Sequence, residues 1–222
     1  MPAVGITDHG NMHGAYEMWS TAVKEGVKPI IGIEAYVTPE TARQDQTRVS
    51  WDTNWNPDID PQHRRRNPND VSGGGLITHL TMWAETDEGL VNLMKASTDA
   101  NLEGRVMRYP RMDKEILAKY SKGIIASSGC PSGIIQTRLL LGQFDEALRA
   151  AGELQDIFGR DNFYIEFMDH GLKIEKQVTD GLLDIAKKLN APLLATNDSH
   201  YVRAEDAGSQ DAMLCINSGS TL

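Results

Sequence analysis

Residues 192–202, PLLATNDSHYV, join a short apolar stretch to two side chains that can bind metal. Pro192 to Thr196 is typical of a buried strand, and Asp198 and His200 follow it directly. Residues two apart in an extended chain point to the same side, so this carboxylate and this imidazole could converge beyond the strand. A D-x-H pair also arises by chance or as a simple hydrogen-bonded pair. Its meaning therefore depends on the rest of the chain.

Five more apolar stretches resemble this one and alternate with segments of helical periodicity. They lie at residues 3–7, 29–37, 76–84, 123–129 and 162–168. The helices are predicted before Gly26, from about Thr86, and over about 144–158, 173–189 and 205–215. Near-continuous apolar strands between helices predict a parallel sheet covered by helices, either open and doubly wound or closed as a barrel. No G-x-G-x-x-G follows a strand, so a dinucleotide-binding fold has no support.

The segment from about 38 to 75 interrupts this alternation. It is rich in Pro, Asn, Asp, Gln and Arg, and it ends in Gly73-Gly74-Gly75. This composition predicts an inserted polar surface loop that is partly disordered. Its one basic run, Arg64 to Arg66, favours a solvated loop over a local phosphate or nucleic-acid contact.

The overall composition is that of a soluble globular protein. The 222 residues are 40% hydrophobic and 24% charged, and no apolar run is long enough to span a membrane. No secretory signal is visible, so Cys130 and Cys215 are expected to be cytosolic thiols. The net charge of -9 argues against broad electrostatic binding to a phosphate backbone. Metal ions at a site could still supply positive charge for such a substrate.

Each predicted strand carries a potential metal ligand at or near its C-terminal end, where barrel enzymes build their active sites. In chain order these residues are Asp8 and His9, Glu34, His79, Cys130, Glu166 with Asp169 and His170, and Asp198 with His200. His13 and His63 are left out, because they are expected on an exposed helix and in the inserted loop.

Most of these residues also have an ordinary structural interpretation. His79 would usually be a hydrogen-bonded core histidine, Cys130 a small buried apolar residue, and Asp169 with His170 a helix cap. Glu34 is harder to dismiss, because a buried carboxylate needs a partner or a metal. Together, imidazole, carboxylate and thiolate ligands suit zinc, manganese or iron in a multinuclear centre that hydrolyses phosphate esters. No G-x-S-x-G sequence favours a serine nucleophile instead.

Six motifs taken together resemble the PHP (polymerase and histidinol phosphatase) domain family, in the form found at the N-terminus of bacterial replicative DNA polymerase III alpha subunits. They are TDHGNMHGAYE, KPIIGIEAYV, THLTM, GIIASSGCPSG, EFMDHG and ATNDSHYV, in the family's order over nearly the whole chain. The likeness is greatest to the actinobacterial type, which also carries an insertion after the EAY strand. The resemblance implies an α/β fold, a distorted seven-stranded TIM-like (β/α) barrel over residues 1–222, with the inserted loop at about 38–75.

Carried over position by position, the resemblance implies six metal ligands: His9, Glu34, His79, Cys130, Asp198 and His200. It implies divalent ions, Zn, Mn or Fe, with up to three in the complete domain. We expect Asp8, His9 and Asp198 to lie closest to the chemistry, with Asp8 orienting the neighbouring ligand rather than binding metal. Glu166 and His170 are not carried over as ligands.

The resemblance is incomplete at the start of the chain. The H-x-H motif of the family's first strand is absent, so that strand is expected upstream of Met1, and the polymerase regions are expected beyond Leu222. The chain would then be a PHP fragment truncated at both ends. We expect weak or no activity from it alone, and reduced stability from an unpaired strand edge.

The resemblance implies a parent protein that is a DNA-directed DNA polymerase, with a PHP domain acting as a metal-dependent 3′→5′ exonuclease. The implied partners are the primer 3′ end of DNA, the C-terminal polymerase regions, and replisome subunits such as the sliding clamp, in the cytoplasm and without a membrane. One alternative is a stand-alone, histidinol-phosphatase-like phosphoesterase. The other is a non-catalytic structural or docking domain of the polymerase.

Overall fold

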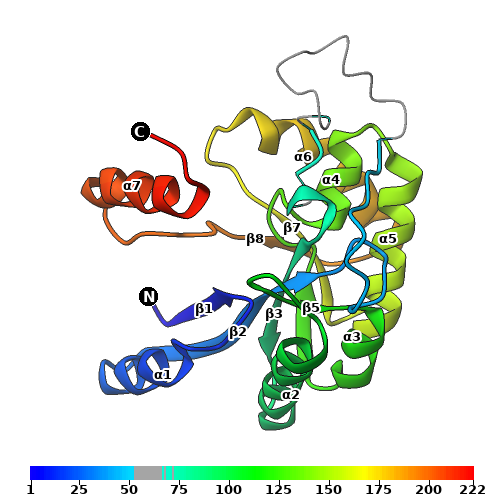
Figure 1. Cartoon of the computed structure of the whole chain (residues 1–222). Helices are drawn as coiled ribbons and strands as arrows, with labels where there is room; N and C mark the ends of the chain where they lie inside the picture. Colours follow the sequence, from blue (N-terminus) through cyan, green and yellow to red (C-terminus); the bar gives the residue numbers. More distant parts are fainter. Residues whose placement is uncertain (53–66, 68, 72) are drawn as a thin grey trace.

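Eight strands form one mixed sheet in the computed structural model, which describes residues 1–52, 67, 69–71 and 73–222 (Figure 1). The strands are β1 (Ala3–His9), β2 (Lys28–Val37), β3 (Thr78–Ala84), β4 (Arg105–Val106), β5 (Tyr109–Met112), β6 (Ile124–Ser127), β7 (Phe163–Phe167) and β8 (Leu193–Ala195). Six of them coincide with the predicted apolar stretches. Their order in the sheet is β4-β5-β2-β3-β6-β7-β8, and β1 pairs with β2.

The prediction of an all-parallel sheet is wrong for β3. This strand runs antiparallel to both of its neighbours, β2 and β6, whereas β1–β2, β2–β5, β6–β7 and β7–β8 are parallel pairs. A parallel neighbour needs a crossover connection, usually a helix. The described residues between Val37 and Thr78 contain only a short 3-10 turn, Gly73–Gly75, so the chain returns as a long hairpin.

The short hairpin formed by β4 and β5 was not predicted. Val106 pairs with Tyr109, which leaves Met107 and Arg108 as a two-residue turn. Met107 has a φ of 55°, a left-handed conformation that favours glycine. The strands are too short and polar to show an alternating pattern, and Pro110 weakens the strand signal further.

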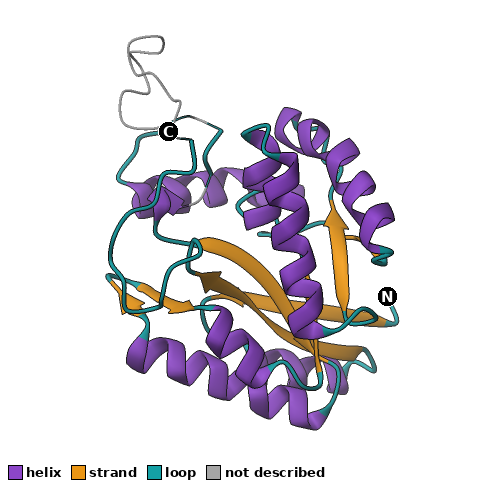
Figure 2. Cartoon of the chain, turned by 90° about the vertical axis from the view of Figure 1, so that its right-hand side faces the viewer, coloured by secondary structure: helices purple, strands orange, loops and turns teal. Residues whose placement is uncertain are grey.

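Seven α-helices are present in the described part of the chain, and Figure 2 shows that most of them lie against the sheet. They are α1 (Ala15–Lys24), α2 (Asp87–Glu103), α3 (Lys114–Tyr120), α4 (Ile134–Leu140), α5 (Phe144–Phe158), α6 (Lys173–Leu189) and α7 (Ala207–Ser218), the last preceded by a 3-10 turn at Ala204–Asp206. The predicted helices are confirmed, and α3 and α4 are additional. Thr86 caps α2 by accepting a hydrogen bond from the N–H of Gly89, at 3.1 Å.

The core lies between the sheet and helices α2, α5 and α6. Small residues of α5, such as Ala147 and Ala151, are completely buried and let the helix approach β7. Phe163 and Ile165 of β7 and Ile185 of α6 fill this layer and are likewise inaccessible. Burying a side chain of this size contributes roughly 1.5–3 kcal/mol, so this layer dominates the stability of the fold.

Helix α1 is less buried than its periodicity predicts. Ala22 is buried as expected, but Trp19 and Val23 remain 48% and 54% exposed. Helix α7 stands apart from the sheet in Figure 1, and none of its residues is buried. In the described residues, no helix combines the length and apolar character needed to cross a membrane.

Residues 38–52 of the predicted insertion are packed against the body of the protein. The fully buried guanidinium of Arg111 donates hydrogen bonds to the carbonyl oxygens of Arg43, Asp45 and Leu76. Trp51 is buried beneath Arg138, whose guanidinium carbon lies 4.2 Å from the indole ring centroid. His63 and Arg64–Arg66 lie outside the described residues.

The α/β class is confirmed, in the form of an open, distorted barrel. Within the described residues, β1 pairs only with β2 and β8 pairs only with β7, so the sheet does not close. It has eight strands where six were predicted within this chain and a seventh upstream of Met1, because the hairpin of β4 and β5 adds two strands to the side of β2 beyond the end of β1.

Candidate metal centre

The ends of β1 and β2 bring His9 and Glu34 together. The strands are parallel, and their register places His9 opposite Glu34. Nδ1 of His9 lies 3.4 Å from Oε2 of Glu34. The Glu34 side chain is only 5% exposed, whereas that of His9 is 41% exposed. The Glu34 carboxylate is therefore buried, whereas the His9 imidazole is partly open to solvent.

His79 reaches the same carboxylate from β3. Its Nδ1 lies 2.7 Å from Oε1 of Glu34. The prediction that His79 sits near the C-terminal end of its strand is wrong, because it is the second residue of β3. Since β3 is antiparallel to β2, its first residues lie beside the last residues of β2, where His79 pairs with Tyr36. His79 therefore reaches the cluster because β3 is antiparallel, and not because it lies at the C-terminal end of its strand.

Cys130 comes from the loop that follows β6. Its sulfur lies 3.4 Å from Oε1 of Glu34 and 3.4 Å from Nδ1 of His79. Gly129 has a φ of 79°, and the side chain of Gln136 donates to the Gly129 carbonyl, so the loop bends sharply just before the cysteine. Burial raises the pKa of the Cys130 thiol well above its ordinary value, and the charge of Glu34 adds to this.

Asp198 and His200 follow β8 and lie on the open side of the cluster. The ring centroid of His200 is 5.7 Å from that of His9. Nδ1 of His200 lies 2.7 Å from the backbone oxygen of Asp198 and 4.0 Å from its Oδ1. Asp198 has a φ of 42°, a conformation uncommon for residues other than glycine. The chain thus bends at Asp198, and both side chains lie near the cluster.

The cluster concentrates acidic groups whose charges interact. Burial opposes ionisation of Glu34, but hydrogen bonding and charge from His79, with a contribution from His9, outweigh it and lower the pKa of Glu34. Burial raises the pKa of Asp198, and the negative charge of Glu34 raises it further. The charge of Glu34 thus opposes ionisation of Asp198, an effect that a cation bound between the two carboxyl groups would relieve.

All six residues of the predicted ligand set lie around this end of the sheet. The ligand atoms of three of them, His9, Glu34 and His79, lie within 4.8 Å of one another. Nitrogen, oxygen and sulfur donors in this combination suit a transition-metal ion. The described residues thus contain a group that could hold a divalent metal.

Asp8 has a different position from the one expected. Its side chain lies on the opposite face of β1 from His9, since side chains alternate along a strand. Its Oδ2 accepts a hydrogen bond from the N–H of Gly14, at 2.8 Å, and so fixes the turn that leads into α1. Among the described residues no hydrogen bond joins it to His9. The Asp8 carboxylate therefore positions the turn before α1 rather than the His9 ring.

Glu166 is not one of the predicted ligands, but it joins two segments that lead to the cluster. It is buried on β7, and its two carboxylate oxygens accept hydrogen bonds from the hydroxyls of Ser127 and Thr196. Burial raises the pKa of Glu166, with the charge of Asp198 adding to the shift. Glu166 therefore ties the end of β6 to the segment that leads to Asp198.

His170 pairs with Glu175 at the start of α6. Nδ1 of His170 lies 2.5 Å from Oε1 of Glu175, and the backbone N–H of His170 donates to Oε2 of the same carboxylate. The hydrogen bond with Glu175 raises the pKa of His170. Glu175 also accepts a hydrogen bond from the N–H of Leu172, so the carboxylate serves as the helix cap.

A cleft of about 770 Å³ opens beside the cluster. His9, His79 and Tyr36 line one part of it, and Arg105 and Arg108 line another. His13 also lines this cleft; it was expected on an exposed helix but lies in the exposed turn before α1. The two arginines were not predicted, because their hairpin was not predicted.

Comparison with known proteins gives one family and a consistent set of relatives. The sequence model of the PHP domain family matches residues 1–170 of this chain. The chain is 51% identical to the DNA polymerase III subunit alpha of Mycobacterium tuberculosis (strain ATCC 25618 / H37Rv), and 53% identical to that of Saccharopolyspora erythraea, over 222 residues in each case. It is 38% identical over 221 residues to the same subunit of Thermus aquaticus. These alignments cover 100% of this chain, but the chain spans only 18%, 18% and 16% of the relatives' lengths.

Proposed function

The chain belongs to the PHP domain family, and we propose that it is the PHP domain of a bacterial replicative DNA polymerase III alpha subunit, with a metal centre that removes nucleotides from the 3′ end of DNA. The observation that carries the proposal is the convergence of six potential ligands, from β1, β2, β3 and the segments after β6 and β8, on one end of the sheet. Identities of 51% and 53% to polymerase subunits over the entire chain support the parentage.

The proposed ligands are His9, Glu34, His79, Cys130, Asp198 and His200. The donor set fits zinc, manganese or iron, and six side chains are enough to hold more than one ion, up to three in a complete domain. When bound, such ions lower the pKa of a water molecule and stabilise negative charge on the oxygens of a phosphate ester.

The residues of the chain divide into a buried base and an exposed rim. Glu34 forms the base, with its Oε2 3.4 Å from Nδ1 of His9 and its Oε1 2.7 Å from Nδ1 of His79. His9, Asp198 and His200 form the rim, with side chains that are 41%, 29% and 43% exposed. In this proposal the substrate phosphate approaches from the rim, and His9 and Asp198 act on it there.

The test is nucleotide release from a 5′-labelled single strand by the full-length protein, together with the metal content of that purified protein. We expect Glu34→Gln to lose bound metal and at least 100-fold in hydrolysis, because it removes the charge shared by both histidines. Glu85→Gln is the matched control. It removes the same charge, and Glu85 is exposed just after β3, at the opposite end of this strand from His79. Equal metal content and equal hydrolysis in both variants would contradict the proposal.

Within this proposal, the whole protein extends primers as a DNA-directed DNA polymerase in the cytoplasm. Its partners are the primer 3′ end, the polymerase regions and other replisome subunits such as the sliding clamp. Measuring primer extension and 3′ hydrolysis on the same full-length protein separates the two activities. Loss of hydrolysis with intact extension in Glu34→Gln is the expected result.

A further inference from the structure

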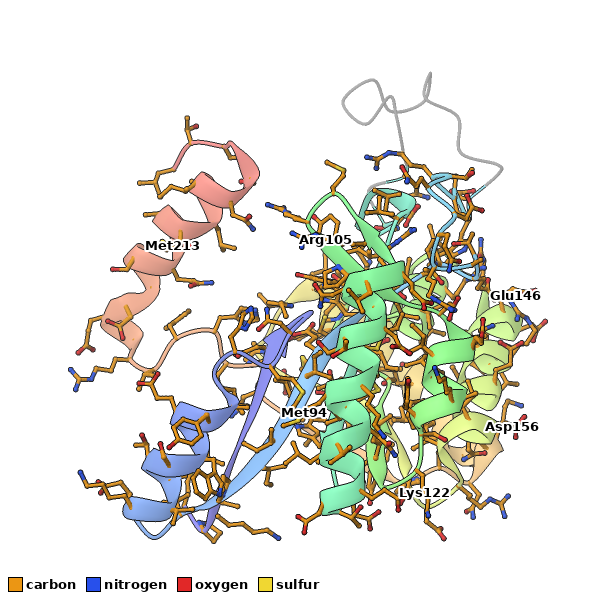
Figure 3. All side chains as sticks on the ribbon, turned by 60° about the horizontal axis from the view of Figure 1, so that its bottom comes forward. Met94, Arg105, Lys122, Glu146, Asp156 and Met213 are labelled. Atoms are coloured by element: carbon orange, nitrogen blue, oxygen red, sulfur yellow. The ribbon has the colours of Figure 1, made fainter. Side chains whose placement is uncertain are left out.

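The cleft beside the metal centre has a cationic end built by the hairpin of β4 and β5. Arg105 begins β4, and Arg108 lies in the two-residue turn; both are exposed. Figure 3 labels Arg105, near the C-terminal end of α2, and Met94 farther along that helix; both residues line the cleft. The chain as a whole carries a net charge of -9, so the charge at this end of the cleft is opposite in sign to that of the whole chain.

In the part of the chain that the structure describes, neither arginine is neutralised by a carboxylate. Within the described residues, Arg105 and Arg108 form no ion pair. Three other arginines show the opposite pattern: Arg43, Arg138 and Arg149 each contact at least one glutamate or aspartate. Paired arginines stabilise the fold, whereas an unpaired guanidinium in a cleft keeps its charge for a ligand.

Arg108 is also held in place by neutral groups. One of its terminal nitrogens donates to Oδ1 of Asn217, at 2.6 Å, and the other to the hydroxyl of Tyr109, at 3.1 Å. The guanidinium carbon lies 5.3 Å from the Tyr109 ring centroid. These contacts fix the side chain without cancelling its charge, so little conformational entropy would be lost when it binds an anion.

A continuous row of rings connects this cationic end to the metal centre. The rings of His9 and Tyr36 are stacked with centroids 6.1 Å apart, and those of Tyr36 and Tyr109 meet edge to face at 5.0 Å. Arg108 then contacts Tyr109. A strand whose last phosphodiester lies at His9 would therefore run along this row and place an upstream phosphate near the arginines.

We propose that Arg105 and Arg108 form a subsite for a backbone phosphate upstream of the bond that is hydrolysed, so that the centre selects a polynucleotide strand over a small phosphomonoester. The subsite rests on the proposed function, because that function places the scissile bond at His9. It adds the residues that recognise a second, upstream phosphate, by charge and without regard to base sequence.

The experiment measures binding rather than hydrolysis, so that it does not depend on catalysis. A 5′-fluorescein oligothymidylate is titrated with the full chain in EDTA, and fluorescence anisotropy is recorded at several salt concentrations. Arg105→Gln and Arg108→Gln are compared with Arg160→Gln, an exposed arginine outside the cleft that loses the same charge. Circular dichroism confirms that each variant is folded.

We expect each cleft variant to bind at least threefold more weakly than the Arg160→Gln control. The slope of log affinity against log salt should fall by about 0.7 for each lost phosphate contact on a single strand. A methylphosphonate, which is uncharged, is then placed at the first or the second linkage upstream of the last one. At one of these positions it should weaken binding by the unsubstituted chain but have no further effect on Arg108→Gln.

Three results would overturn the subsite. They are failure of the unsubstituted chain to bind the strand, equal binding by the cleft variants and the control, and methylphosphonate effects that are the same in Arg108→Gln as in the unsubstituted chain. Hydrolysis assays on the full-length protein with Mn²⁺ separate the failure of the subsite from the failure of the proposed function. Arginine-dependent binding without hydrolysis refutes the exonuclease alone, whereas hydrolysis that is indifferent to both arginines refutes the subsite alone.

Discussion

Gly10 illustrates how a single residue controls the geometry of the metal centre. It follows His9 and has a φ of 67°, and a Cβ atom added there would lie 2.5 Å from the Tyr36 ring. Its N–H donates to the carbonyl of Glu34, at 2.8 Å. The absence of a side chain therefore lets His9 and Tyr36 stack.

Gly10→Ala should destabilise the chain by about 2–4 kcal/mol, because it combines a strained backbone with a steric overlap. Gly26→Ala is a close control, since Gly26 has a φ of 70° and open space around its missing Cβ. It should lose only the backbone part, about 1–2 kcal/mol. Urea unfolding of both variants measures the difference, and equal losses would show that the Tyr36 contact is unimportant.

The pair formed by His170 and Glu175 makes stability depend on pH. Hydrogen bonding to Glu175 raises the pKa of His170 above 6.5, so its contribution is present below about pH 6.5 and is lost as the pH rises through the raised value. Burial opposes ionisation of Glu175, but its hydrogen bonds with His170 keep its pKa below 4.5. The Glu175 contribution is therefore present above about pH 4.5 and is lost in acid.

The two directions together predict a stabilisation that is largest between about pH 4.5 and 6.5. The measurement is the difference in free energy of unfolding between the unsubstituted chain and His170→Gln, from pH 5.5 to 9. This difference should shrink as the pH rises. His13→Gln, which replaces an exposed histidine, should show no such trend, and a constant difference for His170→Gln would refute the prediction.

At the scale of elements, Arg111 joins β5 to the first part of the insertion. Its guanidinium is buried and donates to four backbone carbonyls, those of Arg43, Asp45, Leu76 and Gly104. Burial lowers the pKa of Arg111, but hydrogen bonds to the carbonyls replace the water that it has lost.

Arg111→Met should cost about 3 kcal/mol or more, because it leaves several buried carbonyls without a donor. The expected local effect is faster proteolysis within residues 38–52, since the anchor of that segment is gone. Limited proteolysis followed by mass spectrometry locates the cleavage. Arg160→Met is the control, and identical cleavage patterns would show that other contacts hold the segment.

The sequence predicted some elements well for clear physical reasons. Long apolar strands such as β2 and strongly periodic helices such as α6 carry their own signal, and Gly159 and Asn190 mark two helix ends. The β4–β5 hairpin carried none, since four of its residues are charged or proline. The direction of β3 could not be predicted either, because its apolar pattern is the same whether the strand pairs in a parallel or an antiparallel way.

The candidate site was predicted better in its composition than in its geometry. The residues around Glu34 were found from their chemistry and from the family resemblance. The different position of Asp8, the support from Glu166 and the two cleft arginines depend on contacts between distant segments. A single sequence contains no signal for contacts of that kind.

For the whole molecule, metal binding should couple the site to global stability. The proposed ligands come from segments between residues 9 and 200, so an ion bound among them joins most of the sheet. A ligand that binds only the folded state stabilises it by about 2.7 kcal/mol at 100 times its Kd. Mn²⁺ should therefore raise the Tm of the chain, and EDTA should reverse the increase.

The same thermal experiment on variants shows where the ion binds. Glu34→Gln should abolish the increase in Tm, whereas Glu85→Gln should retain it in full. The increase should also depend on Mn²⁺ concentration until the site is saturated. An increase of the same size in Glu34→Gln would place the bound ion somewhere else on the molecule.

The antiparallel placement of β3 also bears on how this protein can vary. Because β2 and β3 are neighbours of opposite direction, the connection from Val37 to Thr78 leaves and re-enters the sheet at the same end. Changing the length of a loop has a small entropic effect, about 0.6 kcal/mol for each doubling in a flexible chain. A change in length outside the packed residues 38–52 therefore leaves Glu34 and His79 in register at the same end of the sheet, so the metal centre is compatible with connections of different lengths.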